Sequence, residues 1–137
     1  MNQVFVDTVY WVATVKPGDQ WADAARSAKA LLGAVRLVTT DEVLSEFLAA
    51  LSAWGPAVRQ AAVAIVRAIY SDPNVRVIPQ TRETFLKALE RYEGRLDKEY
   101  SLTDCSSMNA MDAERITQIL THDHHFAQEG FVVLITQ

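Results

Sequence analysis

The stretch ILTHDHHF, residues 119–126, places one aspartate among three histidines directly after a short apolar run. Imidazole nitrogens are ligands that zinc and copper prefer, so His122, His124 and His125 invite interpretation as a zinc site. Such a site would need further ligands, but the single cysteine of the chain stands in another segment with no paired spacing. In the alternative interpretation, Asp123 acts with other carboxylates, and the histidines lie on the turn surface or hydrogen-bond locally. The acids that meet Asp123 in the fold decide between the two.

Three other carboxylates stand at positions from which they could reach Asp123. Asp7 follows the apolar run VFV and Asp123 follows ILTH, so both stand at or just past the end of an expected strand. Glu46 lies on the margin of the apolar stripe of an expected helix, and Asp104 stands three residues after Ser101. Each also has an ordinary structural explanation. Asp7 and Asp123 could each cap a turn or the next helix. Glu46 could be an ordinary residue at the boundary of the apolar stripe, and Asp104 could belong to a capping box with Ser101.

Short β-branched runs alternate with longer helical patterns, which is typical of an α/β domain built on a parallel sheet. The expected strands are QVFV (3–6), VRLVT (35–39), VRVI (75–78), TQIL (117–120) and FVVLI (131–135). The first expected helix runs from Asp19 or Gln20 to about Leu32, and the second runs from a capping box of Thr39 and Glu42 to about Trp54. A third runs from Pro56 to the turn at 72–74. The fourth begins at Thr81, and the fifth begins at Ser101 or Thr103. Parallel sheets bind ligands beyond the carboxyl ends of their strands, where Asp7 and Asp123 are expected.

Length and composition limit the class of protein. A chain of 137 residues is the usual size of one domain, so we expect a single domain over residues 1–137. The start MNQVFVDTVYWV has no basic segment of a signal peptide, and no apolar run approaches the ~18 residues that span a bilayer, so we expect a cytoplasmic protein. The formal net charge is -4, so contact with a nucleic acid would need a local basic patch or a bound cation.

The pieces VFVDT, TTDEVLSEF, SLTDC and ILTHDHHF, in this order, resemble the PIN-domain family of metal-dependent ribonucleases. The resemblance is to VapC-like toxins of type II toxin–antitoxin modules in particular, and it covers essentially the whole chain. It implies a three-layer α/β/α fold whose parallel sheet of about five strands has the order 3-2-1-4-5. The four family acids fall on Asp7, Glu46, Asp104 and Asp123, with Thr8 and Thr121 in supporting positions.

The resemblance also implies a function. Carboxylate oxygens select Mg²⁺ or Mn²⁺ over zinc, so the four acids are expected to hold such an ion and to hydrolyse RNA phosphodiester bonds. An antitoxin protein and a second copy of the chain are the implied partners. The sequence departs from the family pattern at Val9, where a small polar residue is common, and at Cys105, where alanine is common.

Two helices suggest binding surfaces. In the helix after Thr81, we expect one apolar stripe, made of Phe85, Leu89, Tyr92 and Leu96. Four basic residues should lie together on roughly the opposite side: Lys87, Arg91, Arg95 and Lys98. This basic side is either a path for RNA or an ordinary solvated face. The helix after Pro56 is apolar nearly all round, which predicts a groove against the preceding helix for a dimer partner or an antitoxin helix.

Two other functions fit an acidic pocket. A PIN-like scaffold would bind partners without cleaving RNA. A phospho-receiver domain would need a lysine at the end of its last strand and a final helix, and the chain shows neither after VVLITQ.

Overall fold

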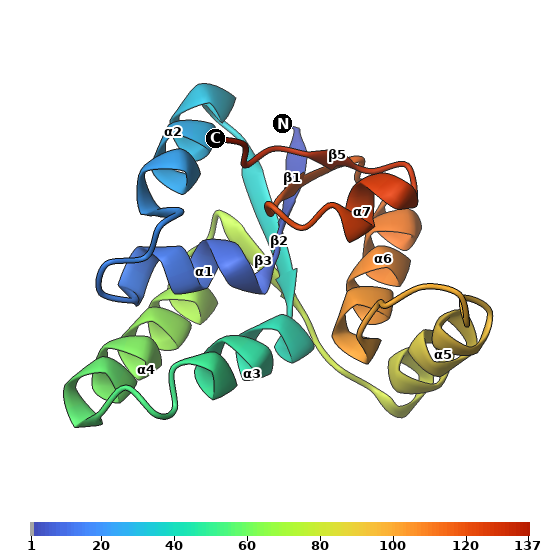
Figure 1. Ribbon diagram of the computed structural model, residues 1–137, viewed down its shortest axis with the longest axis horizontal. Helices are drawn as coiled ribbons and strands as arrows, with labels where there is room; N and C mark the ends of the chain where they lie inside the picture. The colour runs from blue at the N-terminus through green and yellow to red at the C-terminus, as the bar shows by residue number, and fades with distance from the viewer. Residues whose placement is uncertain (1) are drawn as a thin grey trace.

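A five-stranded parallel sheet forms the centre of the computed structural model, which describes residues 2–137 (Figure 1). The strands are β1 (Gln3–Val6), β2 (Arg36–Thr40), β3 (Val75–Ile78), β4 (Gln118–Leu120) and β5 (Val132–Val133). Their order is β3-β2-β1-β4-β5, with every pairing parallel, which confirms the expected topology. A phospho-receiver domain has the order 2-1-3-4-5, so the topology excludes that alternative.

Seven helices cover the sheet in the part of the chain that the structure describes. They are α1 (Thr8–Val15), α2 (Ala22–Leu32), α3 (Asp41–Ala50), α4 (Pro56–Ser71), α5 (Arg82–Glu93), α6 (Leu102–Glu114) and α7 (His125–Gln128). Figure 1 shows α1 to α4 on one side of the sheet and α5 to α7 on the other. This is the three-layer arrangement that we expected, and it follows from the change in direction of the chain between β3 and β4.

The central strand β1 is buried on both faces, as a parallel strand covered by two helical layers must be. Val4, Phe5 and Val6 are all fully buried. Phe5 stands opposite Val38 of β2 and Ile119 of β4, so the core is continuous across the middle of the sheet. This packing fixes where β1 ends, and therefore the position of Asp7, which follows it directly.

The N-terminus of α3 differs from the prediction. Strand β2 extends through Thr40, so Thr40 and not Thr39 is the N-cap, and its hydroxyl accepts a hydrogen bond from the backbone N–H of Val43 at 3.1 Å. The Thr39 hydroxyl donates instead to the carbonyl of Val6, which ties β2 to β1. The predicted capping box of Thr39 and Glu42 is therefore wrong, and α3 ends at Ala50, before Trp54.

Two other helix starts agree with the sequence patterns, and two helices, α1 and α7, were not expected. Thr81 and Ser101 each form a capping box with the residue three positions later, at the starts of α5 and α6. Helix α1 was missed because its sequence TVYWVATV is rich in β-branched and aromatic residues, which favour a strand by propensity. No helix among residues 2–137 is both long enough and apolar enough to cross a bilayer.

Candidate metal centre

The site lies where the sheet order reverses, at the carboxyl ends of β1 and β4. The backbone N–H of Asp7 donates to the Leu120 carbonyl at 3.2 Å, which continues the pairing of the two strands by one residue. The Thr121 hydroxyl donates to Oδ2 of Asp7 at 2.8 Å, and both residues are buried. Asp7 occupies the N-cap position of α1, but its side chain makes no capping hydrogen bond, so capping does not explain why a carboxylate stands there.

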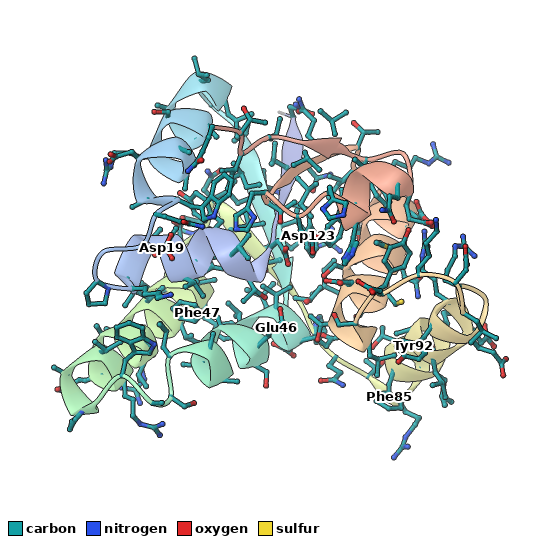
Figure 2. All side chains as sticks on the ribbon, viewed as in Figure 1. Asp19, Glu46, Phe47, Phe85, Tyr92 and Asp123 are labelled. Carbon is teal, nitrogen blue, oxygen red and sulfur yellow. The ribbon has the colours of Figure 1, made fainter. Side chains whose placement is uncertain are left out.

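Glu46 reaches the same region from α3, on the margin of the helix face that buries Val43 and Phe47. The hydroxyl of Thr8, in the first turn of α1, donates a hydrogen bond to Oε1 of Glu46. Figure 2 shows the side chains of Glu46 and Asp123 approaching the middle of the molecule from different elements. The two threonines predicted to support the site thus each hold one carboxylate: Thr121 holds Asp7, and Thr8 holds Glu46.

Asp104 is the third residue of α6, and its side chain reaches the cluster from the first turn of that helix. The backbone N–H of Ser101 donates to its Oδ2 at 3.0 Å, and its own N–H donates to the Ser101 hydroxyl at 2.9 Å. This capping box aims the carboxylate back over the N-terminus of the helix, toward Asp123. The structural role predicted for Asp104 is therefore confirmed, and the same geometry brings it to the acidic cluster.

The charges of the cluster oppose ionisation. Burial raises the pKa of Asp7 from its ordinary 3.8 to about 7, against the hydrogen bonds from Thr121 and the Thr8 backbone, and the charges of Asp104 and Glu46 add to the rise. Burial also raises the pKa of Asp104, and the neighbouring charges of Asp123 and Glu46 act in the same direction. Raised carboxylate pKa values are expected where several acids share a site that no cation neutralises.

His125 lies against the acidic cluster, through a local contact with Asp123 and a longer one with Asp104. Its Nδ1 is 3.2 Å from Oδ1 of Asp123 and 3.9 Å from Oδ2 of Asp104. One ligand atom from each of these three residues lies within 4.8 Å of the other two. The side chain of His125 could not be placed from its sequence alone, because the short helix α7 that turns it inward begins only two residues after Asp123.

A pocket of about 360 Å³ opens beside the cluster, between α3, α5 and α6. Glu42 and Glu46 line one wall, and Thr103 and Ser106 line the other. The Ser106 hydroxyl donates to Oε2 of Glu42 across this space. Sequence reasoning missed both residues, since a serine inside a helix and a second glutamate in an acid-rich turn carry no distinctive spacing.

A family model for the PIN domain matches residues 4–131. The chain belongs to the PIN domain family. No curated protein sequence gives a significant match. The resemblance that the four acidic motifs indicated is thereby confirmed.

Solved structures of two VapC-type proteins share this PIN domain fold. VapC20 of Mycobacterium tuberculosis, described as a toxin that cleaves the sarcin–ricin loop, is 29% identical, with a TM-score of 0.83 over 94% of this chain and 96% of that one. VapBC2 of Rickettsia felis, solved bound to a DNA fragment from its promoter, is 15% identical, with a TM-score of 0.66 over 96% of each chain. At that identity, the second comparison shows the fold alone.

The other two histidines of this PIN domain lie outside the cluster. The His122 ring stacks on Trp21 with 4.0 Å between ring centroids, and His124 is exposed. For these two, the expected position at the turn surface holds. A zinc site built from all three histidines does not form among residues 2–137, because the only ligand group found there combines His125 with two aspartates.

The predicted basic face of α5 does not form as expected. The helix ends at Glu93, so Arg95 and Lys98 lie beyond it, and Arg91 is largely buried with its guanidinium bonded to Asp112 and Glu129. Lys87 pairs with Glu83 on the surface. The large side chains of the predicted apolar stripe are exposed, and the residue of α5 that is buried is Ala88. The stripe residues are Phe85, Leu89, Tyr92 and Leu96. RNA contact by the four basic residues stays a prediction.

Proposed function

We propose that this PIN domain is a divalent-metal-dependent endoribonuclease and the toxin of a toxin–antitoxin pair. The observation that carries the proposal is the convergence of Asp7, Glu46, Asp104 and Asp123, which come from four separate segments of the chain. Burying carboxylates together costs folding free energy, so such a cluster is expected where function requires it. The 29% identity to VapC20 supports a similar chemistry.

The side chains present fit a divalent cation. Carboxylate oxygens are the donors that Mg²⁺ and Mn²⁺ prefer, and the buried Nδ1 of His125 has no hydrogen-bond partner. Asp104 and Asp123 would hold the ion, with Asp7 at the deeper end of the cluster. When bound, Mg²⁺ or Mn²⁺ supplies Lewis acidity for the phosphate group and lowers the pKa of a water molecule.

The protein's own groups have distinct roles in this proposal. Glu46, fixed through Oε1 by the Thr8 hydroxyl, keeps Oε2 free to orient the attacking water and to accept its proton. Asp7 is held in place by Thr121, so it needs no rearrangement when its proton is lost. Because water and not the ribose 2′-hydroxyl attacks, the products carry a 5′-phosphate and a 3′-hydroxyl.

A cleavage assay with Asp123→Asn tests the proposal. The wild-type protein is expected to cut single-stranded RNA with Mg²⁺ or Mn²⁺ and to stop when EDTA is added. Asp123→Asn should lose at least about 10²-fold in rate, the size typical of removing one group that stabilises transition-state charge. The matched control is Asp23→Asn, whose carboxylate is exposed on α2, where it pairs with Arg26.

The ends of the products and the variants together decide the outcome. Products with a 2′,3′-cyclic phosphate, or full activity in Asp123→Asn, would overturn the assignment. Binding of Mn²⁺ without any cleavage of RNA would instead favour the alternative of a binding scaffold.

A groove of about 310 Å³ lies between α3 and α4, where the sequence predicted a partner surface. Its lining includes Leu48, Ala62 and Val63, and of the sixteen residues of α4 only Ala62 and Ile69 are buried. An apolar helix left open in this way is typical of an interface. The groove therefore supports a homodimer, a bound antitoxin helix, or both.

Sedimentation tests this surface. The chain alone is expected to dimerise at micromolar concentration, or to bind an apolar fluorescent dye if it stays monomeric. Val63→Glu should weaken either behaviour by placing a charge in the groove, whereas Arg26→Glu, exposed on α2, should change neither. A monomer that binds no dye would argue against a partner at this groove.

A further inference from the structure

His125 presents an unusual nitrogen at the edge of the acidic cluster. Its Nδ1 is buried, has no hydrogen-bond partner, and lies 3.2 Å from Oδ1 of Asp123. That same Oδ1 already accepts a hydrogen bond from the backbone N–H of His125 at 2.9 Å. A buried polar atom without a partner costs free energy unless something else satisfies it. The open question is therefore what this nitrogen binds.

The surroundings hold the imidazole in place. The ring meets the Tyr100 ring edge-on, at 5.4 Å between centroids, and the side chain of His125 is only 20% exposed. Tyr100 is itself buried and donates to Oε2 of Glu129 at 2.9 Å. A ring fixed on this side can present its Nδ1 lone pair to the cluster without losing much conformational freedom, which is the condition for a good ligand.

We propose that Nδ1 of His125 is a direct ligand of the divalent ion, alongside Asp104 and Asp123. The ligand atoms of the three residues already lie within 4.8 Å of one another, so one ion can contact all three. The inference rests on the proposed function and adds to it the choice of metal. The centre is then a mixed nitrogen and oxygen site, not the all-carboxylate site that the four acids alone describe.

A nitrogen ligand changes which ion the protein prefers. Mg²⁺ favours oxygen ligands and retains its water molecules, whereas imidazole is a good ligand for first-row transition ions. His125 therefore favours Mn²⁺ over Mg²⁺ at this centre. A side chain with an oxygen donor at the same position should reverse that preference.

The direct test is pulsed electron paramagnetic resonance, with no RNA present, on protein that is first stripped of metal and then loaded with Mn²⁺. The wild type is expected to show hyperfine coupling to a directly bonded imidazole nitrogen. His125→Gln should lose this coupling, and the matched variant His124→Gln, changed at the exposed neighbour in the same turn, should keep it. Stoichiometric Mn²⁺ without nitrogen coupling in the wild type would overturn the proposal.

Competition calorimetry supplies a second readout. The ratio of Mn²⁺ to Mg²⁺ affinity should fall about 10-fold or more in His125→Gln, as expected for a group that tunes a metal site, and stay unchanged in His124→Gln. His125→Asp should bind Mg²⁺ at least as tightly as the wild type but show no nitrogen coupling. Metal binding by this variant would show that the missing coupling is not caused by a loss of folding. An unchanged ratio in His125→Gln would also overturn the proposal.

The two proposals can fail separately. Nitrogen coupling in a protein that leaves RNA intact would support His125 as a ligand and count against the nuclease. RNA cleavage with Mn²⁺ and no nitrogen coupling would support the nuclease and reject His125 as a ligand.

Discussion

Asp7→Asn should give a protein that no longer cleaves RNA yet unfolds less readily than the wild type. Cleavage is expected to fall at least about 10²-fold, because the change removes a charge that the reaction needs. Stability is expected to rise at pH 8, in the absence of divalent ions, because Asn keeps an acceptor for the Thr121 hydroxyl but carries no charge that must be buried.

The pKa of Asp7 gives the direction of the pH dependence. Its value of about 7 in the folded protein lies above the ordinary 3.8, so the folded chain holds the proton more tightly than the unfolded chain. The ionised carboxylate therefore opposes folding: the penalty is absent below pH 4, grows between pH 4 and 7, and is complete above that. At about 1.36 kcal/mol for each pKa unit, it is at most about 4 kcal/mol, and we expect Asp7→Asn to recover ~1–3 kcal/mol of it.

Urea unfolding at pH 5 and pH 8, with EDTA present, measures this effect. The gain in Asp7→Asn should be larger at pH 8 than at pH 5, and the control Asp23→Asn should show neither gain. Mn²⁺ should raise the stability of the wild type, since it binds the folded chain, and should do so much less in Asp7→Asn. If Asp7→Asn were less stable than the wild type at pH 8, the carboxylate would be a structural group and not a functional one.

Glu129→Gln should destabilise the fold strongly, although Glu129 lies outside the acidic cluster. Glu129 accepts from Arg91 at 2.8 Å, from Arg95 at 3.1 Å and from the Tyr100 hydroxyl, and its side chain is only 9% exposed. Removing its charge leaves the largely buried Arg91 guanidinium with one fewer partner. Breaking such a pair is expected to cost ~2–4 kcal/mol in the free energy of unfolding.

The matched control is Glu83→Gln. Glu83 pairs with Lys87 at 3.2 Å, but both side chains are mostly exposed, so the change should cost less than about 0.5 kcal/mol. The hydrogen bonds from Arg95, Tyr100 and Arg91 lower the pKa of Glu129 from 4.5 to about 2. Its contribution is thus fully present above pH 4.5 and is lost as the pH falls toward 2, so the difference between wild type and Glu129→Gln should shrink in acid. Equal losses in the two variants would show that the network does not stabilise the fold.

The four acidic motifs carried the resemblance that implied the sheet order, and the observed order confirms it. That Asp7, Glu46, Asp104 and Asp123 act together on a metal ion stays a prediction. Asp7 stands after a fully apolar strand, and Asp104 stands at the third position of a capping box, so local pattern fixed where each would lie. The one-residue error at the start of α3 arose because Thr39 and Thr40 are equally good caps, and only the pairing of β2 with β3 decides between them.

Other features depended on contacts that local pattern does not contain. The inward turn of His125 depends on a four-residue helix and on Tyr100, which is distant in sequence. The sequence pattern did not indicate that α5, which packs on α6, buries the small Ala88 and leaves its large apolar side chains exposed, because periodicity ranks alanine below the large apolar residues around it. Arg91 looked like a surface cation because its partner Glu129 follows 38 residues later.

The pairing of β1 with β4 has a consequence for how the protein is made. The hydrogen bond from Thr121 to Asp7 spans 114 residues of sequence, so the centre closes through one of the longest-range contacts in the chain. Contacts of this kind form late in folding, and a nascent chain emerges from the ribosome N-terminus first. A growing chain that already displays Asp7, Glu46 and Asp104 therefore lacks Asp123 and the strand that positions it. The acidic centre is completed only when β4 takes its place beside β1, after the segment that carries Asp123 has been synthesised.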